Sequence, residues 1–307
     1  MGTPDFAMAS LESILNAGYN VVGVITASDK PAGRGRKLQE SPVKKFAVSK
    51  GLNVLQPTNL KDETFIEELK SLDPNVQVVV AFRMLPKVVW DLPKYGTFNL
   101  HASLLPQYRG AAPINWAIIN NETKTGVSTF FLDEKIDTGA MILQKEIDIA
   151  PEESVGELHD KLMELGSGLV VETLQLIEKG NLTPTPQPFD KLLKDAPKLD
   201  RENTKINWND PLDQIYNLIR GLNPYPAAWC ILFNDGKEEK VKIYHCRKES
   251  SSHSLENGSI FMEDKMLKVA AQGGYLILEE LQLPGKRKMD VKSLLNGYNF
   301  SETAKFR

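Results

Sequence analysis

The sequence predicts an α/β protein: a doubly wound, mostly parallel Rossmann-like sheet followed by a small β domain, either a barrel or a sandwich. Three observations carry this prediction. Strand and helix patterns alternate over the first 180 residues, as they do in βαβ units. Four prolines then fall within residues 181–200, and closely spaced prolines favour an extended connector. Short strand patterns separated by Gly, Asn and Asp follow it.

The elements of the first part follow from local periodicity. Residues 76–82 (VQVVVAF) are apolar enough for a strand that is buried on both faces, and residues 154–179 form a long helical pattern that stops at Gly180. The other candidates are strands at 20–26, 52–55 and 96–100, helices at 41–50, 61–72 and 113–120, and a hairpin of 126–132 with 141–149. Ligands of such sheets bind beyond the carboxyl ends of the strands.

The second part has one amphipathic helix and several short strands. The helix is expected at 211–220, and the strands at 227–233, 239–246, 258–262, 266–270 and 275–283. We therefore divide the 307 residues into an N-terminal α/β domain (1–180), a Pro-rich linker (181–200) and a C-terminal domain (201–307).

Composition excludes several classes of protein. The net charge of −3 does not suggest a general nucleic-acid binder, so any polyanion must be met by local patches. No apolar run has membrane-spanning length, and no cationic–apolar leader is present. We expect a cytoplasmic protein without an obligate protein partner. Cys230 and Cys246 are expected to be free thiols, and the sequence leaves a disulfide between them as the alternative.

The stretch FNLHASLLPQYRGAAP (98–113) places Asn99 and His101 at the end of a predicted strand. Because alternate residues of a strand share a face, the two side chains point the same way. Together they offer two donors to a developing oxyanion. A structural histidine beside a turn-forming Asn explains the same residues.

Asp137 lies in the Asp-Thr-Gly turn of the predicted hairpin. A carboxylate there would raise the pKa of His101 and hold its imidazolium. A plain turn, with no catalytic role, is the alternative. No spacing of His or Cys predicts a metal site, and no GxGxxG or P-loop predicts a nucleotide cofactor.

A basic, Pro/Gly-rich stretch occupies residues 28–44 (SDKPAGRGRKLQESPVK). Its cations are Lys30, Arg34, Arg36 and Lys37. The stretch is either a solvated surface loop or a mobile finger that contacts phosphates.

Taken together, these motifs resemble the methionyl-tRNA formyltransferases, which belong to the 10-formyltetrahydrofolate-dependent formyltransferases. The resemblance covers essentially the whole chain. It rests on GTPDFA, DKPAGRG, NLHASLLPQYRGAAPINWA and IDTG in the first part, and on KINW (205–208) and RGLNPYPAAW (220–229) in the second.

The resemblance implies transfer of a formyl group from 10-formyltetrahydrofolate to the α-amino group of methionyl initiator tRNA. It implies a catalytic trio of Asn99, His101 and Asp137, without a metal. The implied folate-binding residues are Phe82, Arg83, Met84 and Leu85 at a strand end, and Ser103, Leu104, Leu105 and Pro106. The 28–44 loop is implied to contact the tRNA acceptor end, with Arg34 as its principal contact and Arg36, Lys37 and Lys30 beside it. The C-terminal domain is implied to be a small OB-like β-barrel that supports tRNA binding.

The sequence departs from the family pattern in two places. The hairpin before Asp137 is unusually charged. In the family, GTPDFA follows an apolar strand, whereas here Met1 directly precedes Gly2. We therefore expect a sheet without its first strand, either because the start site is wrongly chosen or because the chain is truncated. Two rival functions remain open: formylation of a small amine, such as a sugar nucleotide or purine precursor, and an inactive tRNA- or folate-binding protein.

Overall fold

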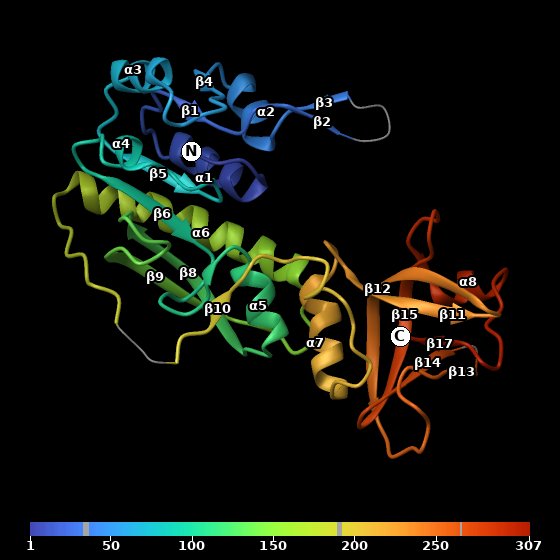
Figure 1. Cartoon of the computed structure of the whole chain (residues 1–307). Helices are drawn as coiled ribbons and strands as arrows, with labels where there is room; N and C mark the ends of the chain where they lie inside the picture. Colours follow the sequence, from blue (N-terminus) through green and yellow to red (C-terminus); the bar gives the residue numbers. More distant parts are fainter. Residues whose placement is uncertain (33–36, 189–191, 265) are drawn as a thin grey trace. The chain divides into compact units, whose positions relative to one another are not determined.

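The computed structural model describes residues 1–32, 37–188, 192–264 and 266–307 (Figure 1). The chain forms two compact units. The first comprises Met1–Gly110, Thr125–Ile147 and Asp160–Asp195, and the second comprises Ala111–Lys124, Asp148–His159 and Ala196–Arg307.

The first unit is built on a mixed sheet. Its strands β5 (Gln77–Val80), β6 (Thr97–His101), β8 (Lys124–Phe131) and β9 (Met141–Asp148) lie in the order β5-β6-β8-β9. Strand β6 pairs parallel to β5 and antiparallel to β8. Strands β1 (Val24–Ile25) and β4 (Val54–Leu55) form a separate parallel pair. The predicted α/β class is confirmed, with a smaller parallel share than the βαβ alternation suggested.

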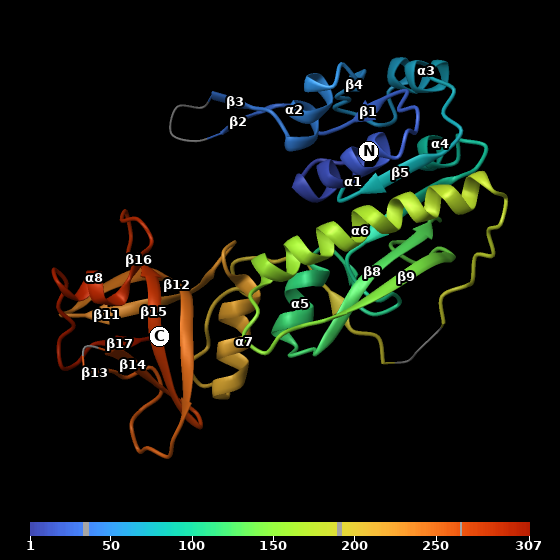
Figure 2. The ribbon, with the colours of Figure 1, turned by 180° about the vertical axis from the view of Figure 1, so that it is seen from behind.

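Helices cover this sheet. They are α1 (Asp5–Asn16), α2 (Pro42–Ser49), α3 (Glu63–Ser71), α4 (Lys87–Trp90) and α6 (Val155–Glu178). Figure 2 shows α6 running along the sheet. The fully buried hydroxyls of Thr129 in β8 and Thr173 in α6 lie 2.8 Å apart, so a polar contact is satisfied inside this apolar layer. Short elements complete the order: β2 (Lys30–Ala32), β3 (Lys37–Gln39), β7 (Arg109–Gly110), α5 (Pro113–Ile119) and β10 (Asp195–Ala196).

Met1 and Gly2 lie between β1 and β5. The Gly2 N–H donates to Ile25 O (3.0 Å), and Met1 O accepts from Val80 N (2.9 Å), so the two residues bridge strands that do not pair with each other in the described structure. A cavity of about 460 Å³ continues between these strands and is lined by apolar side chains such as Leu69, Val78 and Leu174. Met1 and Gly2 thus tie the edges of β1 and β5 together at one end of this cavity.

The second unit is a curled antiparallel sheet with the helices α7 (Leu212–Leu222) and α8 (Val291–Leu295), and it also includes α5. Its strands are β11 (Ala228–Asn234), β12 (Lys237–Ser250), β13 (Ile260–Glu263), β14 (Met266–Ala271), β15 (Gly274–Gln282), β16 (Met289–Asp290) and β17 (Lys305–Phe306). The order is β13-β14-β15-β12-β11-β17, and a bridge between Ser259 and Lys305 joins its two ends. This partly closed barrel agrees with the OB-like expectation.

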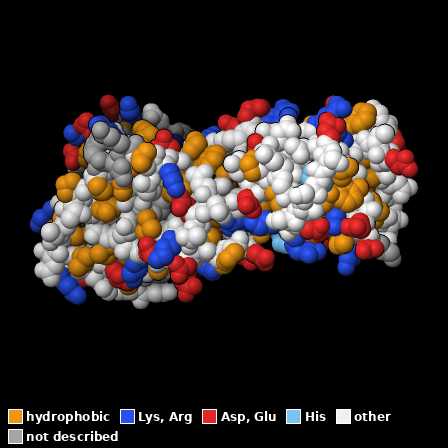
Figure 3. Space-filling view, turned by 90° about the horizontal axis from the view of Figure 1, so that it is seen from below, with side chains coloured by type: hydrophobic (Ala, Val, Ile, Leu, Met, Phe, Trp, Pro, Cys, Tyr) orange, Lys and Arg blue, Asp and Glu red, His pale blue; other side chains and the backbone are white. Residues whose placement is uncertain are grey.

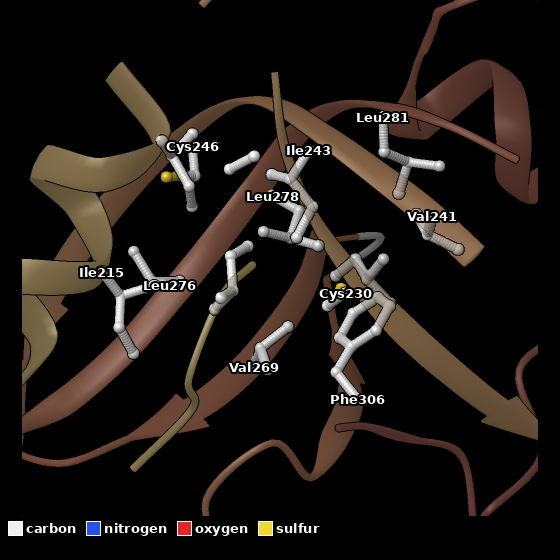
Figure 4. Packing of buried hydrophobic residues seen from close by; sticks show 14 of the residues in the cluster. Ile215, Cys230, Val241, Ile243, Cys246, Val269, Leu276, Leu278, Leu281 and Phe306 are labelled. Atoms are coloured by element: carbon white, nitrogen blue, oxygen red, sulfur yellow. The ribbon is translucent and has the colours of Figure 1, made fainter. Parts of the chain in front are cut away.

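The core of the second unit is apolar and contains both thiols. Leu276, Leu278 and Phe306 are almost fully buried, and Cys230 and Cys246 are buried free cysteines in the same cluster (Figure 4). Burial in this apolar surrounding raises the pKa of both thiols, so they remain protonated and pack as small hydrophobic side chains.

The RGL run at 220–222 joins α7 to α5. Arg220 is buried and donates to Glu153 O (3.0 Å) and Asn217 Oδ1 (2.8 Å). A Cβ on Gly221 would lie 2.6 Å from a side-chain carbon of Ile119, so only glycine permits this approach. The Arg-Gly-Leu part of the family-like motif at 220–229 therefore serves to pack helix α7 against its neighbours.

Replacing Leu278 by alanine should destabilise the second unit by about 2–5 kcal/mol, because the side chain is 2% exposed and its removal leaves a cavity. Urea unfolding followed by tryptophan fluorescence measures the change, since Trp208 and Trp229 lie in this unit. Leu255→Ala, at a side chain that is 45% exposed, is the matched control. Equal unfolding midpoints for the two variants would contradict this core assignment.

None of the helices within the described ranges is both long and apolar enough to span a membrane.

Candidate active site

Strand β6 places Asn99 and His101 on one face of the sheet. Asn99 pairs in register with Val79 of β5 and Phe130 of β8, which holds the backbone on both sides. The Asn99 side chain is half-buried, and within the described part of the chain its carboxamide makes no hydrogen bond. It is therefore available to a ligand. This agrees with the same-face geometry expected from the strand alternation.

His101 is 6% exposed, and one of its ring nitrogens is committed to the backbone. Its Nε2 lies 2.8 Å from Tyr108 O. A carbonyl oxygen only accepts, so Nε2 carries the proton and donates it in this contact. The other nitrogen, Nδ1, lies 3.8 Å from Asp137 Oδ2. That distance is too long for a hydrogen bond, but it is short enough for an ion pair if Nδ1 is protonated. Nδ1 is thus the ring nitrogen left for chemistry.

The Asp137 turn between β8 and β9 is tightly constrained. Asp137 adopts a left-handed backbone with φ of +54°, which for a non-glycine residue costs roughly 1–3 kcal/mol. Its Oδ2 accepts from the Gly110 N–H at 3.0 Å. A Cβ on Gly139 would lie 1.7 Å from Phe131 O, so glycine is required there. The Asp-Thr-Gly pattern is therefore a turn, as the plain interpretation held, and it also directs its carboxylate toward His101.

The segment 103–106 is held by side chains from β8 and β9. Ser128 Oγ donates to Ser103 O (2.6 Å) and accepts from Leu105 N (3.2 Å). Gln144 Nε2 donates to Leu105 O (3.1 Å) and to Ser128 Oγ (2.9 Å). Ser103 and Leu105 are buried, whereas Leu104 and Pro106 are partly exposed. The backbone carbonyls of Ser103 and Leu105 are therefore already used inside the protein.

The second predicted folate segment, Phe82, Arg83, Met84 and Leu85, follows β5 after Ala81 and has no regular secondary structure. Its backbone groups make no hydrogen bond among the residues that the structure describes. The exposed Arg83 guanidinium donates to Thr58 O (2.8 Å) and to Pro57 O, which turns it toward its own chain. Among the described residues of these two segments, the backbone groups that remain available to a ligand are therefore those of 82–85, whereas the carbonyls of Ser103 and Leu105 are already hydrogen-bonded.

The basic stretch forms an antiparallel pair of β2 and β3. Lys30 is exposed at the start of this pair, and the backbone of Lys37 begins β3. Arg34 and Arg36 lie outside the described residues, so their proposed role stays a prediction.

Three contacts at the site were missed by sequence analysis. They are the Tyr108 carbonyl, the Gly110 N–H and the side chain of Gln187, whose Nε2 donates to Asp137 O and Gly139 O, each at 2.9 Å. The first two are backbone groups and carry no residue-type signal. Gln187 lies between two prolines in the predicted linker, and the only sequence signal is a lone amide within a Pro-rich run.

No group of three or more His, Cys, Asp or Glu residues in the described ranges could hold a metal ion.

Comparisons with known proteins identify the family of this chain. A family model described as formyl transferase matches residues 1–174, and a formyl transferase C-terminal domain matches residues 198–299. Curated methionyl-tRNA formyltransferases are similar over the full length. The protein of Flavobacterium johnsoniae is 58% identical, covering 99% of this chain and 97% of its own, and that of Bacteroides fragilis is 51% identical, covering 100% and 96%.

Solved structures show the same fold. The N-formyltransferase of Helicobacter canadensis, in complex with folinic acid and dTDP-3-aminofucose, aligns with a TM-score of 0.64 at 20% identity, covering 94% of this chain and 97% of that one. The full-length relatives, both domain models and the convergence of Asn99, His101 and Asp137 lead to one assignment. This chain belongs to the methionyl-tRNA formyltransferase family.

Proposed function

We propose that this protein transfers the formyl group of 10-formyltetrahydrofolate to the α-amino group of methionyl initiator tRNA. The observation that carries the proposal is the juxtaposition of His101 Nδ1 and Asp137 Oδ2 beside the carboxamide of Asn99, which makes no hydrogen bond to any residue that the structure describes. This set suits acyl transfer, because such a reaction needs donors for a developing oxyanion and a path for one proton.

Asn99, His101 and Asp137 have different roles in the proposed chemical step. The neutral amine attacks the formyl carbon, a C–N bond forms, and the formyl oxygen becomes an oxyanion. The Asn99 amide and the Nδ1–H of protonated His101 stabilise that oxygen, while Asp137 balances the imidazolium charge. The bond from the formyl carbon to the folate nitrogen then breaks. The proton lost by the amine reaches that nitrogen through His101 or a water held by Asp137, so no covalent enzyme intermediate is required.

We place the pterin of the donor against residues 82–85 and 103–106. The backbone groups at 82–85, which make no hydrogen bond within the described ranges, can pair with the polar edge of the ring. The 103–106 segment supplies one wall of the proposed folate site. Ser128 and Gln144 hold its shape, because their side chains donate hydrogen bonds to the carbonyls of Ser103 and Leu105.

His101→Ala and Asp137→Asn should each lower kcat by about 10²- to 10⁴-fold, the range that general acid–base groups contribute. Transfer of radiolabelled formyl to charged initiator tRNA measures kcat. His245→Ala, at an exposed histidine of β12, is the matched control and should leave kcat unchanged. Near-normal turnover of either site variant would refute its assigned role.

The same assay separates the alternative functions. Formylation of an amino sugar nucleotide or a purine precursor in place of tRNA would favour the small-amine alternative, and absence of turnover by the parent protein would favour a binding protein.

We further propose that the second unit contacts the tRNA through a group of cations around Trp229. The charged atoms of Arg201, Lys205 and Lys240 lie 5.4, 5.7 and 4.0 Å from the ring centroid. Neither these three nor Lys242 makes an ion pair with an acidic side chain in the described structure. Burial, together with the positive charges of Arg201 and Lys242, lowers the pKa of Lys240. A phosphate bound there would relieve this repulsion.

Such a local group is needed because the chain as a whole carries a net charge of −3, which does not favour RNA binding. On the face shown in Figure 3, lysine and arginine side chains are interspersed with aspartate and glutamate. The basic 28–44 stretch, with Arg34 as its principal contact, is proposed as the second tRNA contact, at the acceptor end.

We also propose a cytoplasmic location for this protein.

The double variant Lys205→Ala/Lys240→Ala should weaken tRNA binding and reduce the slope of log Kd against log salt concentration by about 1.5, since each phosphate contact contributes roughly 0.7–0.9. Filter binding at several salt concentrations measures both quantities. Lys237→Ala, at an exposed lysine of the same strand β12, is the control. Identical salt slopes for the double variant and the control would exclude this surface as a tRNA contact.

A further inference from the structure

The chain that follows α6 returns to the active site of the first unit. Thr185 exchanges two backbone hydrogen bonds with Met141, the first residue of β9, at 2.8 and 2.9 Å. Two residues later Gln187 is 8% exposed, although Pro186 and Pro188 on either side are exposed. A buried polar side chain in an otherwise exposed segment must have its hydrogen bonds satisfied by the protein.

The carboxamide of Gln187 is fully engaged. Its Nε2 donates to Asp137 O and to Gly139 O, each at 2.9 Å. Its Oε1 accepts from Arg109 Nε (3.2 Å) and Nη2 (2.6 Å). A carboxamide has two N–H donors and one carbonyl acceptor, and all are used here. A carboxylate could keep the Arg109 contact but could not donate to the two carbonyls.

These contacts form a closed circuit around Asp137. The Asp137 backbone is held by Gln187, Gln187 is held by Arg109, and the next residue, Gly110, donates its N–H to the Asp137 carboxylate at 3.0 Å. Both the backbone and the side chain of Asp137 are thus tied to one dipeptide. This matters because the left-handed backbone of Asp137 is not one that the residue favours by itself.

We propose that Gln187 is a positioning residue for formyl transfer: it holds the Asp137 turn so that the carboxylate faces His101 Nδ1. The inference rests on the catalytic role proposed for Asp137. Gln187 itself acts through the turn and not on the reacting atoms. A shift of the carboxylate by about 1 Å is enough to lower a rate by roughly 10²-fold.

Gln187→Ala should lower kcat by about 10- to 100-fold and change the KM values for folate and tRNA by less than about threefold. Gln187→Glu should be at least as impaired, because it retains the acceptor that faces Arg109 and loses both donors. Gln175→Ala, at an exposed glutamine of α6, is the matched control and should resemble the parent protein. Thermal melting of each variant shows whether it is folded.

A double-mutant cycle separates positioning from general stability. In an Asp137→Asn background, Gln187→Ala should reduce kcat by less than about twofold further, because the group that Gln187 positions is already disabled. Parent-like kcat of Gln187→Ala or Gln187→Glu, beside an impaired Asp137→Asn, would overturn the positioning role alone. So would a full additional loss in the Asp137→Asn background. Parent-like kcat of Asp137→Asn would instead overturn the role assigned to Asp137, and the positioning role with it.

Discussion

Hydrogen bonding along both edges of β6 fixes the position of the candidate active site. The strand pairs with β5 on one side and β8 on the other, and this pairing leaves Asn99 and His101 no freedom of register. A slip by one residue would move both side chains to the opposite face of the sheet. The His101–Tyr108 hydrogen bond then fixes the ring orientation and the protonated nitrogen.

The remaining parts of the site depend on polar contacts that reach across the chain. The 103–106 wall is held by Ser128 and Gln144, from β8 and β9. The Asp137 turn is held by Gly110 and Gln187. Each of these contacts satisfies a backbone group that would otherwise be costly to bury, so the same hydrogen bonds that stabilise the loops also preorganise the site. The rigid sheet therefore supplies two of the proposed catalytic groups, and a braced turn supplies the third.

In the proposed function, the first unit carries out the chemical step and the second unit contacts the tRNA. The first unit contains the proposed chemistry, while the second combines an apolar barrel core with cations gathered around Trp229. Buried thiols that remain protonated contribute to packing and not to chemistry. The RNA contact proposed for the second unit therefore relies on a local group of cations, because the chain as a whole has a net charge of −3.

Residue types and their order along the chain were enough to predict the α/β class, the change to short strands after residue 200 and the shared face of Asn99 and His101. These features depend on local periodicity, and alternation along a strand fixes the face of a side chain without knowledge of the fold. Sequence alone could not show whether Asp137 reaches His101, because Asp137 lies in a turn whose left-handed backbone depends on distant contacts. Gln187 is 50 residues from Asp137 and 78 from Arg109, and a hydrogen bond over that separation leaves no local pattern. Only the tertiary structure brings these groups together, because their partners are backbone carbonyls and N–H groups that every residue carries.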